Sequence, residues 1–304
     1  MIINFDEALE SVKTLKKKKI AVIGAADKDV LIAVMDAVNK NIIEPILIDS
    51  KEKILALNSS ELNLNNIEII DEKERINQCQ IGIKLVKENK ADILMKGLIS
   101  TPILFKEILN KETGLRSGKL LTHIGVIKTP YYHKMLIMTD GGIVISPTLE
   151  DKIAILENAV IASKALNIDI PKVALISAIE TITPNMQSTI DAAIISKMNQ
   201  RGQLPGMIID GPLAMDVAVS REAADHKKIK SDVAGDADII LMPNIESGNV
   251  FYKALVYLGG GADTAGIVLG AAVPIVVPSR SDSPSNKLNS IVMAILISNS
   301  MFNK

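Results

Sequence analysis

The chain repeats one arrangement of apolar and polar positions: a short β-branched run, a turn rich in Gly, Asp, Ser or Pro, and an amphipathic stretch. The short runs predict strands, and the stretches with apolar residues at helical spacing predict helices. Strands are expected at residues 20–23, 46–48, 67–70, 93–95, 135–138, 173–177, 207–209, 239–242 and 275–277, and helices at 30–39, 72–89, 102–109, 150–166, 186–198, 248–258 and 285–298.

These strands are apolar throughout rather than alternating, which is expected when helices cover both faces of a sheet. The regular alternation of strands and helices predicts mainly parallel sheets with right-handed crossovers. The fold class is therefore α/β. A chain of 304 residues with so many strands favours two domains, with a boundary in the segment 141–147, which contains Gly-Gly and Pro.

Composition narrows the classes of function. Apolar residues make up 48% of the chain and charged residues 23%, which excludes a disordered protein. A formal net charge of -1 and only 3% aromatic residues give no footprint for nucleic acid or an anionic membrane. No stretch reaches the ~20 uninterrupted apolar residues of a membrane span, and the N-terminus lacks the pattern of a secretory signal. We therefore expect a soluble protein, and the single cysteine, Cys79, favours the reducing cytoplasm.

The chain has few residues for metal binding or thiol chemistry. Cys79 is the only cysteine, so it can form neither an internal disulfide nor a thiolate metal site, and it lies on the apolar face of a predicted helix. The histidines are scattered at positions 123, 133 and 226. No metal site and no bound cofactor are expected.

The segment 274–284, Pro-Ile-Val-Val-Pro-Ser-Arg-Ser-Asp-Ser-Pro, carries the most information. A buried strand ends near Val277, polar side chains follow, and Ser283 and Pro284 have the residue types of an N-cap and a first helical position. Ligands bind at such strand-to-helix turns in open α/β sheets, and Arg280 beside helix N–H groups suits a phosphate. The alternative is a serine-rich turn without a ligand, in which Arg280 pairs with Asp282.

Two further polar clusters follow predicted strands. Lys96 ends one strand, and Ser100 or Thr101 can cap the helix that begins there; Lys96 is either a surface lysine or an anion contact. Asp140 ends another strand, where it either contacts substrate or closes an Asx turn. Carboxyl ends of parallel strands share one edge, so these turns together predict a binding site.

Several strings in the chain resemble the phosphate acetyl/butyryltransferase family, and its butyryl branch most closely. The strings are ADILMKGLIST (91–101), LIMTDGG (136–142), LISAIE (175–180), DGPLAMDVA (210–218), HKKIKSDVAGDADIILMPNIESGN (226–249) and GIVLGAAVPIVVPSRSDS (266–283). Each is weak alone, but together they cover nearly the whole chain in a consistent order. Leu98-Ile-Ser-Thr101 and Ser279-Arg280-Ser281 depart from the strings usual in the acetyl branch and favour the butyryl branch.

The resemblance implies two α/β/α domains with mainly parallel sheets and an active-site cleft between them. The first would comprise residues 1–143 plus 276–304, and the second residues 144–275. The implied reaction is butyryl-CoA plus phosphate to butyryl phosphate plus CoA, freely reversible, through a ternary complex. Coenzyme A and phosphate are then substrates and no cofactor is needed. The family also implies a homo-oligomer, a dimer or larger.

By the Ser-Arg match, Ser279 resembles the family's hydrogen-bond donor to the acyl carbonyl and Arg280 its phosphate clamp. Asn286 stands where the acetyl branch has a basic Asp, so that role does not carry over, and Asp282 is the substitute. The alternative is that CoA enters the site already as the thiolate, so that no base is needed. Lys96, Ser100, Thr101, Asp140 and Ser283 complete the expected substrate-binding set. The first-domain basic residue that the acetyl branch uses is left open among Lys96, Lys106 and His133.

Three rival functions remain open. An acetyl-CoA-specific enzyme would differ only in the size of its acyl pocket. A metal- and NAD-dependent hydroxyacid decarboxylase of the isocitrate dehydrogenase type would need a cluster of acids, for which only Asp210, Asp216, Asp236 and Asp238 are available. A non-catalytic protein that binds a small anion would share the cleft.

Overall fold

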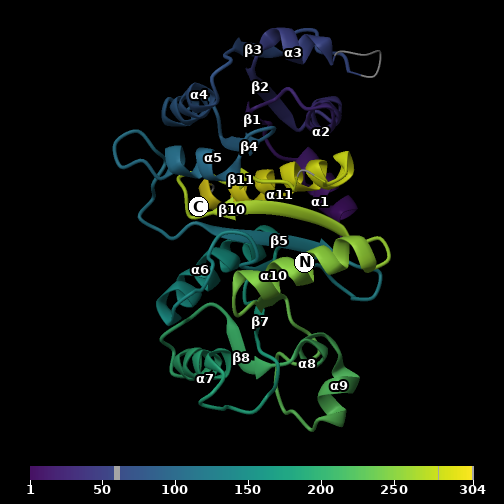
Figure 1. The fold of residues 1–304 in the computed structure, drawn as a ribbon. Coiled ribbons are helices and arrows are strands. Elements are labelled where there is room, and N and C mark those ends of the chain that lie inside the picture. The colour runs from purple at the N-terminus through teal and green to yellow at the C-terminus, as the bar shows by residue number, and fades with distance from the viewer. Residues whose placement is uncertain (58–61, 280, 303–304) are drawn as a thin grey trace. The chain divides into compact units, whose positions relative to one another are not determined.

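The computed structural model describes residues 1–57, 62–279 and 281–302 (Figure 1). It divides into two compact units: a terminal unit, Phe5–Lys119 with Ala265–Lys304, and a central unit, Met1–Asn4 with Leu120–Thr264. Each is an α/β unit, which confirms the expected fold class. The expected domain boundaries at 143/144 and 275/276 stay a prediction.

The terminal unit contains α1 (Phe5–Lys13), β1 (Lys18–Ile23), α2 (Lys28–Asn39), β2 (Ile43–Asp49), α3 (Lys51–Ala56), β3 (Glu68–Asp71), α4 (Arg75–Lys87), β4 (Ile93–Lys96), α5 (Thr101–Ile108), most of β10 (Asp263–Leu269), β11 (Ile275–Val276) and α11 (Pro284–Phe302). Its strands follow the order β3-β2-β1-β4-β11-β10. All neighbours are parallel except β11 and β10.

Helices cover both faces of this sheet (Figure 1). Helices α1, α2 and α11 pack together, and α4 packs on α5 and on strands β1, β2 and β4. Helix α11 is buried on all sides: every residue from Asn286 to Ser298 is buried, polar ones included. A helix without a solvent-exposed face lies inside its unit, so α11 is a core element whose N-terminus follows the end of β11.

The central unit contains β5 (Thr122–Lys128), β6 (Leu136–Thr139), α6 (Leu149–Ala165), β7 (Lys172–Ile176), α7 (Gln187–Gln200), β8 (Ile208–Leu213), α8 (Met215–Val219), α9 (Arg221–His226), β9 (Ile239–Leu241) and α10 (Ile245–Leu258). Its strand order is β5-β6-β9-β7-β8, and only β5 and β6 pair antiparallel. Its core includes Ile127, Met138, Ala174 and Ile240, with α8 and α10 packed against them.

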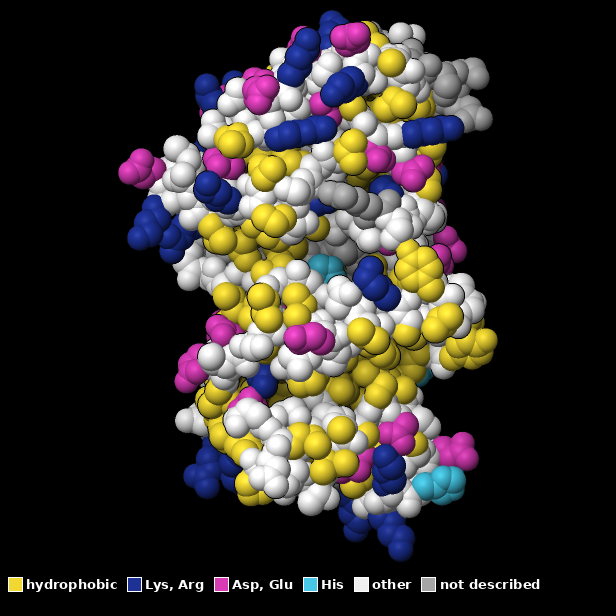
Figure 2. Space-filling model, viewed as in Figure 1, with side chains coloured by type: hydrophobic (Ala, Val, Ile, Leu, Met, Phe, Trp, Pro, Cys, Tyr) yellow, Lys and Arg dark blue, Asp and Glu magenta, His cyan; other side chains and the backbone are white. Residues whose placement is uncertain are grey.

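Helix α10 leaves much of its apolar surface exposed. Gly248 is its only buried residue, and Val250, Tyr257 and Leu258 are 67%, 61% and 85% exposed. Figure 2 shows hydrophobic side chains gathered over this helix. A cavity of about 190 Å³ beside it is lined by Phe251 and Leu255, among others. No helix in the described part of the chain is both long and apolar enough to span a membrane.

The predicted strands and long helices are all present, within a few residues of the expected limits. The sequence pattern missed β5 and β10. Each of these strands contains an interior glycine, Gly125 or Gly266, and begins with polar residues, so the β-branched run is interrupted. Both strands take part in antiparallel pairs, which lie outside the strand–helix–strand pattern used for the prediction.

Candidate functional site: the carboxyl edge of the terminal sheet

The turns that follow β1, β2, β4 and β11 lie at one edge of the terminal unit's sheet. Lys96 pairs in register with Ile23 of β1, and Met95 pairs with Val276 of β11. Because these strands are parallel, their carboxyl ends meet there. Six of the sequence-predicted residues belong to these turns: Lys96, Ser100, Thr101, Ser279, Asp282 and Ser283. Arg280 lies outside the described residues.

The turn between β11 and α11 is closed by its own polar groups. The N–H of Ser279 donates to Oδ2 of Asp282 at 2.7 Å, and the N–H of Asp282 donates to the carbonyl of Ser279 at 3.2 Å. Asp282 is only 5% exposed. The hydroxyls of Ser279 and Ser281 lie 3.1 Å apart. The Asp282 carboxylate therefore fixes the backbone that carries the Ser279 hydroxyl.

Helix α11 begins as the sequence predicts. Pro284 is its first residue, and Oγ of Ser283 accepts a hydrogen bond from the N–H of Asn286 at 3.2 Å, which confirms Ser283 as the cap. In the next turn, Oγ of Ser290 donates to the carbonyl of Asn286 and accepts from the N–H of Gly266. These bonds tie the start of α11 to the end of the sheet.

The turn after β4 is docked on the turn after β1, backbone against backbone. The N–H of Gly97 donates to the Ile23 carbonyl, and the N–H of Leu98 donates to the Gly24 carbonyl at 2.6 Å. A Cβ atom on Gly97 would lie 2.2 Å from the Gly24 carbonyl oxygen, so only glycine fits there. Gly24 itself has a φ of +70°, in the left-handed region.

Three polar side chains lie at the turn between β4 and α5. Lys96 is 5% exposed, and its Nζ donates to the Gly97 carbonyl at 3.5 Å. Ser100 occupies the N-cap position of α5, as predicted, but its hydroxyl makes no capping bond. Thr101 is the first residue of that helix. The two hydroxyls are therefore placed at a helix N-terminus without being needed to hold it.

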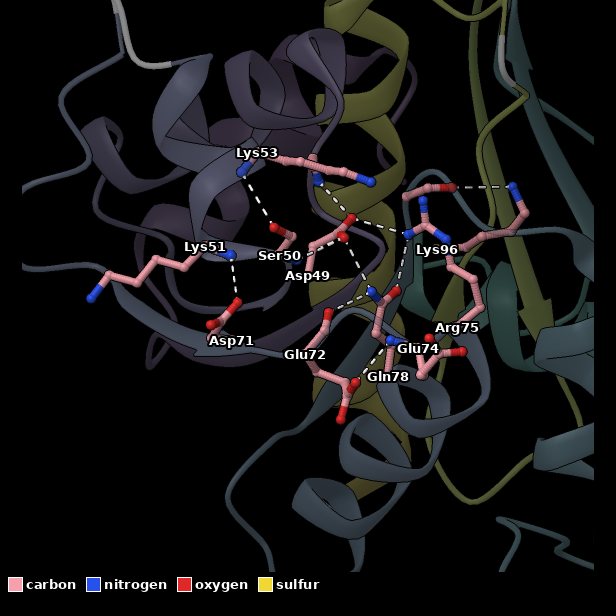
Figure 3. A network of polar contacts seen from close by, with 12 residues as sticks. Asp49, Ser50, Lys51, Lys53, Asp71, Glu72, Glu74, Arg75, Gln78 and Lys96 are labelled. Atoms are coloured by element: carbon pink, nitrogen blue, oxygen red, sulfur yellow. Dashed lines mark hydrogen bonds and ion pairs between the residues drawn. The ribbon is translucent and has the colours of Figure 1, made fainter.

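A second network at this edge was missed by the sequence analysis (Figure 3). Asp49 ends β2 and is 1% exposed; its oxygens accept from the N–H groups of Ala26 and Ser50, from Gln78 Nε2 and from Arg75 Nη1. Arg75 Nη1 also donates to Gln78 Oε1, while Nε and Nη2 make no hydrogen bond with the described residues. The network thus holds a partly exposed guanidinium at the carboxyl edge. The sequence does contain a signal for this network. An acidic residue, Asp49, ends strand β2, and an arginine, Arg75, begins the helix that follows strand β3.

The remaining candidates lie in the central unit or on a helix. Asp140 forms the Asx turn considered above: Oδ1 accepts from the N–H groups of Gly142 and Ile143, and Oδ2 accepts from the N–H of His123. Its contact with substrate stays a prediction. His133 lies in the central unit, 3.0 Å from Asp236, and Lys106 lies in the last turn of α5.

Three of the four acids available to a hydroxyacid decarboxylase, Asp216, Asp236 and Asp238, pair with lysines, and Asp210 accepts the N–H of Gly211. Lys134 Nζ lies 2.8 Å from Asp236 and 2.6 Å from Asp238, and Lys172 lies 2.6 Å from Asp236. Asp216 pairs with Lys227 at 3.0 Å. Within the described ranges, no three His, Cys, Asp or Glu side chains gather as metal ligands. Burial raises the pKa of the Cys79 thiol to about 12, so this group is a protonated core residue.

Comparison with known proteins agrees with the resemblance read from the sequence. Residues 72–295 match the family described as "Phosphate acetyl/butaryl transferase". The phosphate butyryltransferase of Clostridium acetobutylicum is 43% identical over 98% of this chain and 99% of its own length. The phosphate acetyltransferase of Thermotoga maritima is 41% identical over 95% of this chain and 98% of its own.

A solved structure supports the same conclusion at the level of fold. The crystal structure of a branched-chain phosphotransacylase from Enterococcus faecalis V583 superposes with a TM-score of 0.82 at 31% identity. It covers 92% of this chain and 99% of its own. The family match spans well over half of the sequence, and the relatives cover nearly all of it. The chain belongs to the phosphate acetyl/butyryltransferase family.

Proposed function

We propose that this protein exchanges a short acyl group between coenzyme A and inorganic phosphate, converting butyryl-CoA and phosphate to butyryl phosphate and CoA through a ternary complex. The observation that carries the proposal is the closed turn at the end of β11, where Asp282 fixes the backbone of Ser279 next to Arg280. Relatives named phosphate butyryltransferase at 41–43% identity support the acyl group. We place the enzyme in the cytoplasm.

The proposed chemistry requires few groups. Arg280 and Lys96 hold phosphate, one oxygen of which attacks the thioester carbonyl and forms the new C–O bond. The Ser279 hydroxyl donates to the negative carbonyl oxygen of the tetrahedral intermediate. The C–S bond then breaks, its electron pair leaves on sulfur, and the CoA thiolate takes up a proton. In the reverse direction Asp282 accepts the thiol proton, because the free thiol is only a few per cent ionised at neutral pH.

The other candidates are assigned by their place in the fold. Ser100, Thr101 and Ser283 have hydroxyls at the two helix N-termini of the carboxyl edge, where donors to an anion are needed. Asp140 remains in the proposed substrate-binding set. We add Arg75 to Lys96 as a second cation at this edge, because Nε and Nη2 of its fixed guanidinium make no hydrogen bond to the residues that the structure describes. It would serve the phosphates of CoA.

The decisive assay follows free thiol released from butyryl-CoA with and without inorganic phosphate. Phosphate-dependent release, with butyryl phosphate as the second product, is expected. Release that is slow and independent of phosphate would contradict the proposal. Acetyl-CoA is the alternative substrate: the Thermotoga relative carries that name at 41% identity. Each methylene in a fitted pocket contributes about 0.8 kcal/mol, so kcat/KM should rise from acetyl- through propionyl- to butyryl-CoA.

Asp282→Asn separates two roles of this side chain. The amide oxygen can still accept the Ser279 N–H, so the turn is retained, but an amide cannot accept the thiol proton. We expect kcat in the direction of butyryl-CoA synthesis to fall by about 100-fold or more at pH 7, and to recover partly as rising pH ionises the thiol. If Asp282 only positions Ser279, the variant will keep the parent's rate and pH profile.

We also propose that the enzyme is a homo-oligomer, with the exposed face of α10 as its contact. Val250 and Leu258 are exposed on this helix, and the apolar cavity beside them extends the same surface. Val250→Asp with Leu258→Asp is expected to lower the molar mass measured by light scattering to that of one chain. Ile170→Asp, at another 60% exposed apolar position, is the control and should leave the mass unchanged. An unchanged mass in the double variant would exclude this face.

A further inference from the structure

A buried cation lies beneath the turn that carries Ser279. Lys287 is in the first full turn of α11, and only 2% of it is exposed. Its Nζ donates to the main-chain carbonyl of Asp282. Among the described residues, no carboxylate forms an ion pair with Lys287. The Asp282 carbonyl is the only group among them to which the Lys287 side chain is hydrogen-bonded. The position is electrostatically unfavourable, because the N-terminal end of a helix already carries positive potential.

Two other buried lysines among the described residues, Lys152 and Lys134, are neutralised by carboxylates. Lys152, which is 6% exposed, pairs with Asp191 at 2.5 Å. Lys134, which is 5% exposed, pairs with two aspartates. Burying an ammonium group without a counter-charge destabilises a fold, whereas an apolar residue of the same size would fill the space without that cost. Lys287 is therefore better explained by something that binds nearby than by packing.

The contacts of Lys287 connect it to the reacting groups. Its ammonium group holds the carbonyl of Asp282, the Asp282 carboxylate holds the N–H of Ser279, and the N–H of Lys287 donates to the Ser283 carbonyl at 3.0 Å. The missing counter-charge would be supplied by an anion on this turn. Inorganic phosphate and the phosphoryl group of an acyl phosphate share that chemistry.

On the basis of the proposed function, we infer that Lys287 is a positioning residue for phosphate: it supplies positive charge from beneath the turn and fixes Asp282 and, through it, Ser279. Among the described residues the charge has no carboxylate partner, and it becomes balanced when the phosphate dianion binds. The residue then acts on phosphate far more than on the CoA moiety, and it reduces the stability of the free enzyme.

Lys287→Met and Lys287→Gln test this inference. Both remove the charge, but glutamine keeps a donor for the Asp282 carbonyl. We expect KM for phosphate to rise about tenfold or more in both variants, since a unit charge several ångströms away acts with that strength in a partly buried site. KM for butyryl-CoA should change by less than about twofold. The melting temperature of Lys287→Met without phosphate should equal or exceed the parent's, because a buried, uncompensated charge is gone.

Ser290→Ala is the matched control on the next turn of α11. Ser290 is fully buried and hydrogen-bonded to Gly266 and Asn286, so its loss should lower the melting temperature and leave KM for phosphate unchanged. If Lys287→Met behaves like this control, with a lower melting temperature and an unchanged KM, Lys287 is structural and the inference fails.

A second measurement does not depend on turnover. Inorganic phosphate should raise the parent's melting temperature, and the Lys287 variants should need about tenfold more phosphate for the same shift. Lys287→Arg, which keeps the charge, should stay close to the parent. A phosphate-induced shift that is equal in the parent and in Lys287→Gln would overturn the inference. Absence of phosphate-dependent thiol release by the parent would instead refute the proposed function, so the two failures are distinct.

Discussion

Ser279→Ala is expected to reduce kcat for phosphate-dependent thiol release by about 100- to 1,000-fold, the usual effect of losing one oxyanion donor. The N–H of Ser279, and not its hydroxyl, forms the bond to Asp282, so the alanine variant keeps the turn closed. KM values should therefore change little, and the melting temperature should stay within a few degrees of the parent's. Steady-state kinetics with butyryl-CoA and phosphate measure the effect.

A matched control for this variant is Ser285→Ala. Ser285 is exposed and lies in the first turn of α11, only six residues beyond Ser279. Its loss should leave kcat within about twofold of the parent, as is usual for surface substitutions away from special features. A Ser279→Ala enzyme that retains more than a tenth of the parent's kcat would remove the hydroxyl from the proposed chemistry.

The largest effect on stability is expected for Lys134→Met in the central unit. Lys134 and Asp238 are 6% and 4% exposed in their side chains and lie 2.6 Å apart. Removing one partner of a buried ion pair typically costs 3–5 kcal/mol, because the other charge is left uncompensated. Urea unfolding at pH 7 should show a loss of about this size. Lys172→Met, which affects only the more exposed Asp236, should cost much less.

The same cluster predicts an acid dependence. Burial alone would raise the pKa of Asp236, but hydrogen bonds from Lys134 and Lys172 outweigh it and hold this pKa below its ordinary value. A pKa that is lower in the folded than in the unfolded chain stabilises the protein above about pH 4, and this contribution is lost as pH falls further. The parent's stability should therefore decline below pH 4 more steeply than that of Lys134→Met; equal slopes would contradict the assignment.

The fold and the position of the turn between β11 and α11 could be predicted from the sequence because the signals are local. Buried parallel strands are continuous apolar runs, and Ser283 followed by Pro284 marks the start of a helix, so the turn that holds Ser279 could be placed at a strand end. The expectation of phosphate chemistry came from Arg280 in the sequence and from the family strings, and the role of Arg280 stays a prediction.

The other features depend on contacts between residues far apart in the sequence. Asp49 and Arg75, 26 positions apart in the sequence, meet only because β2 ends and α4 begins at the same edge. Lys287 stands among residues of a helix that could have had a solvent-facing side, and only its 2% exposure shows that its charge is buried. Strands β5 and β10 were missed for a similar reason. Their own residues give no continuous β-branched run, and each is identified as a strand by its antiparallel pairing with a neighbour.

The contact between Gly24 and Gly97 sets a limit on how this enzyme can be altered. Neither turn can change its path without displacing the other, because no side-chain atom separates them. Directed evolution toward a longer or branched acyl chain should therefore leave both positions untouched and accumulate its changes elsewhere. The two turns form a rigid backbone support, and the side chains that face the substrate can be exchanged without moving it.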